Sequence, residues 1–244
     1  MRIKATPHSG AGRHNAVLES SSQRITHGGS WKKQRVAMLI PAASMIATRV
    51  YLSHCSLIFP PNQGVHRMAA VGDEVGQAFS DSILSIISTP GIQDWEYLLT
   101  IETDNTPPQD GVLKLVQRME QNPHLAVIGG LYWTKGEGGV PQIWGDPNDP
   151  EINFRPQPPD PKGGLKECCG TGMGFTLWRL GMFKDTRLRR PWFKTVAGLE
   201  GVGTQDLYFW GDARKYGYRC AIDCSCLVGH YDLEGKFGPP DTTW

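Results

Sequence analysis

The 244-residue sequence has little net charge, no long apolar run and no internal repeat. Its 25 Lys and Arg residues balance 24 Asp and Glu residues, which gives a formal net charge of +1. Overall electrostatics therefore do not argue for a nucleic-acid or membrane partner. The nearest candidate for a membrane span, residues 36–48, contains Pro41 and falls short of the 18 or more apolar residues that a span needs. We expect no membrane span.

The sequence also lacks the patterns of a secreted or zinc-stabilised protein. Basic residues before position 36 imitate a signal peptide, but a long polar segment precedes them and no cleavage site follows. There are six cysteines, without the paired CxxC knuckles of a structural zinc site. The sequence therefore predicts a cytoplasmic protein with reduced thiols. The cysteines are Cys55, Cys168, Cys169, Cys220, Cys224 and Cys226.

Glycine and proline are frequent but stay below the level of a low-complexity chain. Together they make up 29 + 18 = 47 of 244 residues, or about 19%, against the roughly 25–30% that would argue for disorder. Residues 1–33 are polar and aperiodic, which predicts a disordered or loosely attached tail. Residues 34–244 are long enough for one domain with a buried core and many loops.

Apolar runs and amphipathic segments alternate from residue 35 onward. Continuous apolar runs predict strands over 36–40, 65–71, 95–101, 125–133 and 220–228. Helical spacing predicts helices over 44–57, from a cap at Asp73 to residue 90, over 110–122 and over 204–216 with Thr204 as the cap. The order predicts an α/β fold with a mostly parallel sheet, whose ligands lie at the carboxyl ends of the strands. The irregular stretch 136–200 is too long for a plain connection, so we expect it to be functional.

An acidic turn follows the third predicted strand. In the segment ETDN, Glu102 and Asp104 are separated by one residue, so in extended backbone their carboxylates point to the same side. Such a pair repels unless a cation lies between the two groups, and oxygen ligands suit Mg²⁺ or Mn²⁺. The alternative is a solvated turn that is capped by Asp104 and Asn105.

Four segments in order resemble the GT-A glycosyltransferases, especially the compact family 2-like enzymes of bacteria and phages. The turn at 101–104 (IETD) looks like their DXD motif, with Glu in place of the first Asp. The other three are 125–135 (LAVIGGLYWTK), the Gly-rich 169–179 (CGTGMGFTLWR), and the C-terminal series TQDLYF, YGYR and VGH that ends at His230. The resemblance spans about residues 35 to 232. It implies a GT-A, Rossmann-like sheet with a loop-rich acceptor side.

The resemblance implies a metal-dependent transferase that moves a sugar from a UDP- or GDP-linked donor to an acceptor hydroxyl. Asp104 and His230 would ligate Mn²⁺ or Mg²⁺, and Glu102 would contact the metal or the ribose. Asp206, near a helix N-terminus, would be the general base if the reaction inverts the anomeric configuration, or would position the acceptor if the configuration is retained. Donor-binding residues would be Pro41, Ala42, Asp73, Glu102, Asp104 and Lys135. The acceptor side would include Gly170, Thr171, Gly172, Gln205, Arg189 and Trp192.

Each role has a simpler alternative. Asp73 could only cap a helix, Lys135 could only be solvated, and His230 could be a surface residue at a strand end. Asp206 could be an acidic residue in the first turn of a helix, where Asp is common, without a catalytic role. Gln205 stands where the family usually has an acid.

A basic and aromatic segment follows residue 183. It suggests an anionic acceptor, with nucleic acid as one case, or a solvated loop anchored by Pro191. Its members are Lys184, Arg187, Arg189, Arg190, Lys194, Trp192 and Phe193.

Two other classes of function remain open at the level of the sequence. One is a nucleotidyltransferase, which would be expected to show a Gly-rich phosphate loop after the first strand; the segment PAAS at 41–44 lacks one. The other is a non-catalytic module that binds sugar or nucleic acid.

Overall fold

The computed structural model describes residues 33–42, 45–136, 138–149, 151, 153–198 and 201–232. The chain divides into two units, Met1–Lys33 and Gln34–Trp244, and the architecture below is that of the second. The predicted tail 1–33, apart from Lys33, and Ala43 and Ser44 at the predicted start of the first helix lie outside the described residues. No helix in the described part of the chain is long and apolar enough to cross a membrane.

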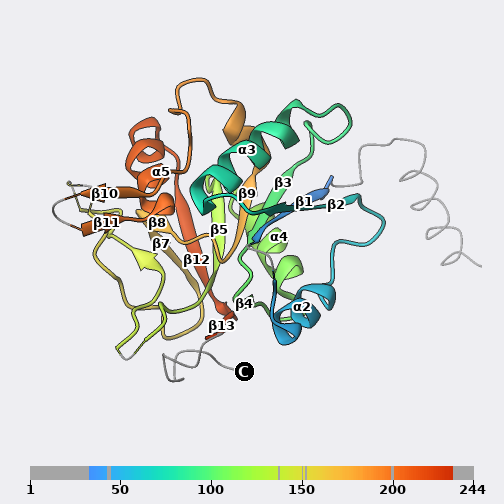
Figure 1. Cartoon of the computed structure of the whole chain (residues 1–244). Helices are drawn as coiled ribbons and strands as arrows, with labels where there is room; N and C mark the ends of the chain where they lie inside the picture. The colour runs from blue at the N-terminus through green and yellow to red at the C-terminus, as the bar shows by residue number, and fades with distance from the viewer. Residues whose placement is uncertain are drawn as a thin grey trace, which may run out of the picture. The chain divides into compact units, whose positions relative to one another are not determined.

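A seven-stranded sheet forms the centre of this unit, in the order β2-β1-β3-β9-β5-β12-β7 (Figure 1). The strands are β1 (Val36–Ala42), β2 (Val65–Val71), β3 (Tyr97–Ile101), β5 (Val127–Leu131), β7 (Leu165–Cys168), β9 (Phe175–Arg179) and β12 (Cys220–Leu227). Strands β1, β2, β3, β5 and β12 run in one direction, whereas β9 and β7 run antiparallel to their neighbours. The predicted α/β fold with a mostly parallel sheet is confirmed.

Helices cover both faces of the sheet, and each face has its own apolar core. Helix α3 (Val75–Ser88) packs with Phe79, Ile83 and Ile86 on one face, and α4 (Gly111–Gln121) packs with Leu115 and Met119 on the other (Figure 1). Helix α2 (Thr48–Cys55) is shorter than predicted, and α5 (Gln205–Ala213) continues into a 3₁₀ turn, η2 (Arg214–Tyr216). The apolar spacing in the sequence is thus the direct cause of the two-sided packing.

The helix caps differ in part from those predicted. Glu74, not Asp73, is the N-cap of α3, because its carboxylate accepts the Gln77 N–H at 3.0 Å. Thr204 does stand at the N-cap of α5, but its side chain makes no capping hydrogen bond. Asp73 is therefore free of the capping role that the sequence suggested for it.

The stretch 136–200 is more ordered than predicted. It contains β6 (Ile143–Trp144), β7, β8 (Gly170–Thr171), β9, the 3₁₀ helix η1 (Leu180–Lys184) and β10 (Val196–Gly198), which pairs with β11 (Gly201–Gly203). Strand β9 lies between β3 and β5, antiparallel to both, and is buried along most of its length. This insertion was missed because the sequence of one strand does not reveal which distant strands will pair with it.

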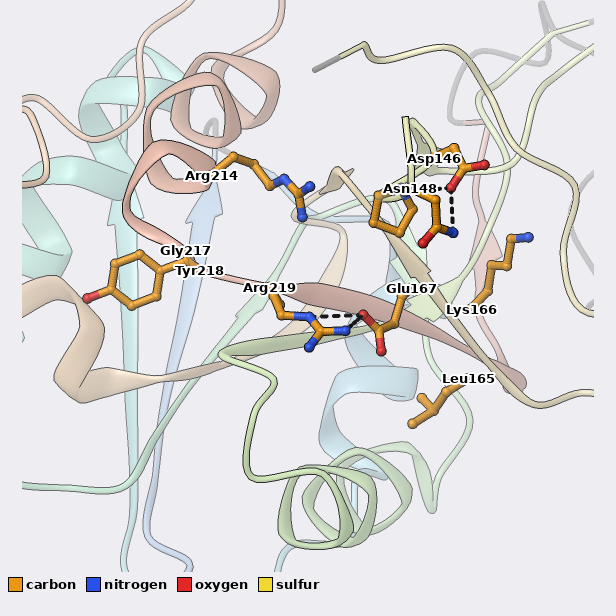
Figure 2. A pocket seen from close by; sticks show the side chains of 10 residues that line it. Asp146, Asn148, Leu165, Lys166, Glu167, Arg214, Gly217, Tyr218 and Arg219 are labelled. Carbon is orange, nitrogen blue, oxygen red and sulfur yellow. Dashed lines mark hydrogen bonds and ion pairs between the residues drawn. The ribbon is translucent and has the colours of Figure 1, made fainter. Parts of the chain in front are cut away.

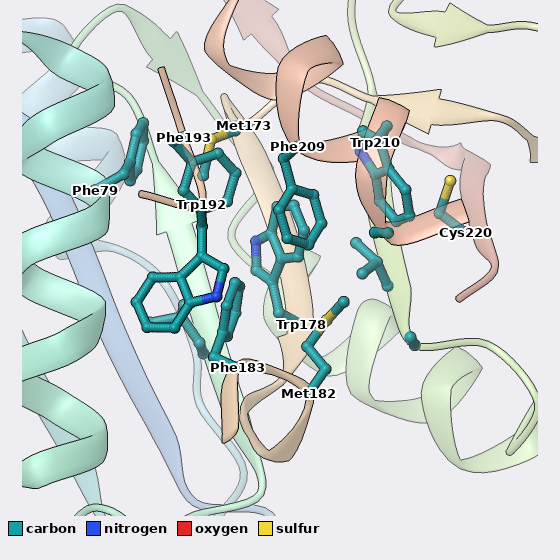
Figure 3. Packing of buried hydrophobic residues seen from close by; sticks show 14 of the residues in the cluster. Phe79, Met173, Trp178, Met182, Phe183, Trp192, Phe193, Phe209, Trp210 and Cys220 are labelled. Carbon is teal, nitrogen blue, oxygen red and sulfur yellow. The ribbon is translucent and has the colours of Figure 1, made fainter. Parts of the chain in front are cut away.

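Aromatic side chains fill the core between the sheet and α5 (Figure 3). The Trp178 ring on β9 stacks on Trp210 of α5 with centroids 5.9 Å apart, and Phe209 meets its edge at 5.5 Å. Phe183 and Phe193 contact Trp178 at 5.7 and 5.9 Å. Because aromatic pairs of this kind add to the energy of area burial, they hold α5 firmly against the sheet.

We expect Trp178→Ala to lower the free energy of unfolding by about 3–5 kcal/mol, since it empties the centre of this cluster. The indole N–H also donates to Thr100 Oγ1 at 3.0 Å, and that contact would be lost. Urea denaturation followed by circular dichroism measures the change. Leu52→Ala is the control: Leu52 is 60% exposed on α2, so it should change the free energy by no more than about 0.5 kcal/mol. Equal losses of unfolding free energy in both variants would contradict the conclusion that Trp178 is the centre of the aromatic core.

Candidate active site at the carboxyl edge of the sheet

The acidic turn lies where the parallel strands end. Glu102 follows β3 directly, and its N–H donates to the carbonyl of Gly174, just before β9, at 3.1 Å. The Asn105 N–H then donates to the Glu102 carbonyl at 3.2 Å, which closes the turn. The turn is therefore held by backbone contacts on both sides.

A short two-stranded sheet brings the end of the chain to this turn. Strand β4 (Asn105–Thr106) pairs antiparallel with β13 (Gly229–His230), so that His230 lies opposite Asn105. The Asp104 carbonyl also accepts the Tyr231 N–H at 2.5 Å. This pairing of segments more than a hundred residues apart places His230 beside Asp104.

Asp104 contacts two groups that the sequence assigned to the same site. Its Oδ2 lies 2.5 Å from the Lys135 ammonium and 3.5 Å from Nε2 of His230. Burial alone would raise the pKa of Asp104, but the contacts with His230 and Lys135 outweigh it and lower the pKa to about 2. The other oxygen, Oδ1, is shielded from solvent and has no hydrogen-bond partner among the described residues.

The His230 ring is oriented by a backbone carbonyl. Its Nδ1 lies 2.6 Å from the Trp133 carbonyl oxygen, a contact that requires a hydrogen on Nδ1. In the neutral ring, Nε2 then carries a lone pair and faces a carboxylate oxygen of Asp104. Two electron-rich atoms at this separation call for a proton or a cation between them.

Glu102 and Asp206 add two carboxyl groups to the same region. Burial, together with the charges of Asp104 and Asp206, raises the pKa of Glu102 to about 8. Burial also raises the pKa of Asp206, which is 7% exposed at the N-terminus of α5 and accepts the Leu207 N–H at 2.9 Å. The charge of Lys135 lowers the pKa of Glu102, but by less than burial and the two acids raise it. The site therefore has more carboxyl groups than cationic groups, and burial favours the neutral forms of Glu102 and Asp206.

One pocket of about 350 Å³ unites most of the predicted donor residues. Its volume falls in the range of small-molecule sites. The end of β1, the start of α3, the acidic turn and the start of α5 line it. The lining residues are Pro41, Ala42, Asp73, Val75, Glu102, Thr103, Asp104 and Gln205. Asp73 thus faces the pocket, and Gln205, which was assigned to the acceptor side, lies in the same pocket as the donor residues.

Two residues, Tyr132 and His54, support the site without having been singled out from the sequence. The Tyr132 hydroxyl accepts the Gly174 N–H at 2.8 Å, and its ring meets His230 edge-on at 5.6 Å. His54 is buried beneath the turn with Nε2 2.9 Å from the Asn105 carbonyl oxygen. Tyr132 lies within the segment 125–135 that carries the resemblance, so that segment was the available signal; nothing in the sequence indicated His54.

The Gly-rich segment before β9 divides between the site and the core. A side chain at Gly172 would overlap with the Tyr132 hydroxyl, and one at Gly174 would overlap with Asn105. Gly170 instead packs on Trp210, and Thr171 is fully buried with its carbonyl accepting the Trp210 indole N–H at 3.2 Å. Gly172 therefore borders the carboxylate site, whereas Gly170 and Thr171 belong to the aromatic core.

Two members of the predicted basic and aromatic segment, the buried Trp192 and the half-buried Arg189, pack against the rest of the protein. Trp192 is 2% exposed and packs on Phe183 in the core. The Arg189 guanidinium donates to the Tyr208 carbonyl, and the backbone N–H of Arg189 donates to the Asp212 carboxylate at 2.9 Å. The structure thus places Trp192 and Arg189 in the packing around α5 and not beside the carboxylates.

Two further cations of that segment are neutralised by acids. Lys184 pairs with Asp94 at 2.7 Å, and Arg187 pairs with Asp185 at 2.6 Å. Because these two cations already have carboxylate partners, they add little support for a nucleic-acid acceptor.

Comparison with known proteins supports the fold and goes no further. No protein-family model matches the sequence, and no curated protein sequence matches it either. Among solved structures, A197 from STIV superposes with a TM-score of 0.54 at 16% identity, over 81% of this chain and 86% of that chain. GalNAc-T7, solved with UDP, GalNAc and Mn²⁺, superposes with a TM-score of 0.50 at 12% identity, over 86% of this chain and 46% of that one. This chain thus spans less than half the length of GalNAc-T7, and at these identities the likeness shows a GT-A, Rossmann-like fold alone.

Proposed function

We propose that this protein is a metal-dependent glycosyltransferase that transfers a sugar from a UDP- or GDP-linked donor to an acceptor hydroxyl. The observation that carries the proposal is the cluster of carboxyl groups at the edge of the sheet, where Asp104 meets His230 and Lys135 beside the pocket that Glu102 lines. GalNAc-T7, which has a similar fold, is a protein solved with UDP, GalNAc and Mn²⁺. The resemblance of the four sequence segments points to the same chemistry.

The residues at the turn fit a divalent cation. Asp104 Oδ1 is a buried carboxylate oxygen without a hydrogen-bond partner among the described residues, and Nε2 of His230 lies 3.5 Å from the other oxygen of the same carboxylate. Within the described ranges no three His, Cys, Asp or Glu side chains lie close enough to enclose a metal. Mg²⁺ and Mn²⁺ sites of transferases commonly take the remaining ligands from substrate phosphates and water. Asp104 and His230 would therefore hold the cation, with the donor completing its coordination.

When bound, the cation would stabilise the negative charge of the departing nucleoside diphosphate. Lys135 would add a second positive charge on the same side, because its ammonium lies 2.5 Å from Asp104. The pocket that Pro41, Ala42 and Asp73 line would hold the nucleoside, and Glu102 would accept or donate a hydrogen bond to the ribose. Each of these contacts positions the donor while its glycosidic bond to phosphate breaks.

Asp206 would act on the acceptor. Its carboxylate would take the proton of the acceptor hydroxyl as the oxygen attacks the anomeric carbon. A general base is most effective when its pKa lies near the working pH, and burial moves the pKa of Asp206 in that direction. The aromatic packing of Trp210 and Phe209 on Trp178 fixes the helix that carries Asp206.

A donor screen tests the proposed function. The full chain is incubated with UDP- and GDP-linked sugars in Mn²⁺, Mg²⁺ or EDTA, and release of nucleoside diphosphate is measured. We expect release from at least one donor, with a loss of about 100-fold or more in EDTA. Pyrophosphate release from a nucleoside triphosphate with a sugar phosphate would instead identify a nucleotidyltransferase. Saturable donor binding without any release would identify a binding module.

A further inference from the structure

A second pocket opens at the other end of helix α5, and the carboxylate site makes no use of it (Figure 2). Its volume is about 640 Å³. The turn after β6, the edge strand β7 and the segment between η2 and β12 line it. Its polar members are Asp146, Asn148, Lys166, Glu167, Arg214, Tyr218 and Arg219. Gln205 at the start of α5 faces the first pocket and Arg214 at its end faces the second, so the helix separates them.

Arg214 has no acidic partner in the described part of the chain. It follows the last residue of α5, and its Nε is shielded from solvent without a hydrogen-bond partner. Figure 2 shows its guanidinium reaching into the space between Asn148 and the Arg219–Glu167 pair, with no interaction to either. A buried donor without a partner is uncommon in folded proteins, so this group points to a ligand.

The acids of this pocket are already satisfied. Glu167 forms an ion pair with Arg219 at 2.6 Å. Asp146 accepts both the backbone N–H of Asn148 at 2.9 Å and its side-chain amide at 3.0 Å. Three basic residues, Lys166, Arg214 and Arg219, thus line the pocket with two acids, and among the described residues the buried Nε of Arg214 has no acceptor. The lining therefore has an excess of one positive charge.

We propose that this pocket binds the phosphate group of a small phosphorylated molecule, with Arg214 as its main ligand. A guanidinium presents two parallel donors that match phosphate oxygens, and partial burial strengthens such a contact. The volume is larger than a phosphate needs and lies in the range of small-molecule sites. Pro147, Leu165 and the ring of Tyr218 supply apolar surface for the rest of the molecule. The site is separate from the proposed transferase site and does not depend on its function.

Titrations of the ¹⁵N-labelled full chain test this site, with inorganic phosphate, AMP and UMP as probes in buffer containing EDTA. We expect AMP or UMP to saturate and to shift the Arg214 Nε–Hε resonance. Arg214→Met should weaken this binding at least about 10-fold, because the fork of donors is lost. Arg214→Lys, which keeps the charge, should weaken it less. Lys114→Met is the control for loss of a positive charge elsewhere, since Lys114 pairs with Asp110 on α4, and it should leave binding unchanged.

Several results would overturn the proposal. One is equal affinity of the wild type and Arg214→Met, with thermal melting used to confirm that the variant is folded. Another is absence of saturation by all three probes below about 10 mM, or saturation by inorganic phosphate alone. Loss of binding in Asp104→Asn would place the probe in the carboxylate pocket and would also refute the second site. Failure of the transferase assay would leave these outcomes unaffected, so the two proposals are tested separately.

Discussion

Replacing Asp104 by Asn is expected to reduce nucleoside diphosphate release about 100-fold or more. The substitution keeps the size of the side chain but removes the charge that faces both Lys135 and His230. It also replaces one of the two carboxylate oxygens by an amide NH2 group, which cannot ligate a cation, and leaves only an uncharged carbonyl oxygen. Mn²⁺ affinity, followed by the electron paramagnetic resonance signal of free Mn²⁺, should fall together with turnover.

Asp94→Asn is the matched control for this experiment. Asp94 also pairs with a lysine, Lys184, at 2.7 Å, but its side chain is 74% exposed, and it lies before β3, at the opposite end of that strand from the acidic turn. Its loss should leave both Mn²⁺ affinity and turnover at the level of the wild type, since exposed ion pairs contribute little. Unchanged turnover in Asp104→Asn would refute the metal assignment, and so would equal losses in the two variants.

Replacing Asp206 by Asn is expected to lower the rate of transfer about 10²–10⁴-fold while donor binding is retained. The side chain is buried at the start of α5 and takes no part in the contacts of Asp104 with Lys135 and His230. A loss in turnover without a loss in donor affinity is the signature of a group that acts only in the chemical step. Single-turnover transfer and equilibrium donor binding, measured on the same preparations, separate the two.

The pH dependence gives a second measure of the role of Asp206. Burial raises the pKa of this carboxyl group, and only its ionised form can accept a proton. Transfer by the wild type should therefore decline as pH falls through a value above the ordinary carboxyl pKa of about 3.9. This acidic limb should be absent from the residual activity of Asp206→Asn. A limb that persists in the variant would assign it to another group.

The Asp206→Asn substitution should lower activity without lowering the stability of the fold. Because the folded state raises the pKa of Asp206, folding binds the proton more tightly than the unfolded chain does, and stability declines as pH rises through that pKa. Asn carries no charge to bury, so Asp206→Asn should be at least as stable as the wild type at pH 7. Thermal melting checks this and excludes unfolding as the cause of lost activity.

Asp212→Asn is the control for position on helix α5. Asp212 is buried to the same extent as Asp206, with 7% exposed for each, but it accepts the Arg189 N–H at 2.9 Å and lies away from the acidic turn. The Asp212→Asn variant should be less stable than the wild type, but its catalytic rate per folded molecule should be unchanged. A large loss of rate in Asp212→Asn at full folding would contradict the special role given to Asp206.

The spacing of apolar residues within one short segment correctly predicted several helices and strands. The apolar residues of α4, Val112, Leu115, Val116 and Met119, are buried as the helical spacing predicts. The run 97–101 is a fully buried strand, and Glu102 and Asp104 follow it as predicted. These predictions succeed because burial of one face is decided by residues close together in the chain.

Contacts between distant segments could not be predicted in the same way. Strand β9 enters the sheet antiparallel between β3 and β5. Trp192 packs in the core beneath Arg190, although basic residues stand two positions before it and two positions after it in the sequence. Arg214 ends a helix that looks ordinary in sequence, and only folding brings it opposite Asn148 and Arg219. Such contacts depend on loop closure and on the shape of the whole core, and a short stretch of sequence carries no information about either.

The sequence by itself determined the alternation of strands and helices, the acidic turn at the end of a buried strand and the absence of a long apolar run. The tertiary structure decided which groups meet there. Pairing of β13 with β4 sets His230 beside Asp104, and Lys135 reaches the same carboxylate from the end of β5. The near-zero net charge of the chain thus hides two local features, a cluster of carboxyl groups at one end of α5 and, at the other, the guanidinium of Arg214, which has no acidic partner among the described residues. The physical reason is that charge balance is fixed by composition, whereas the field at a site is fixed by which side chains the fold brings within a few ångströms.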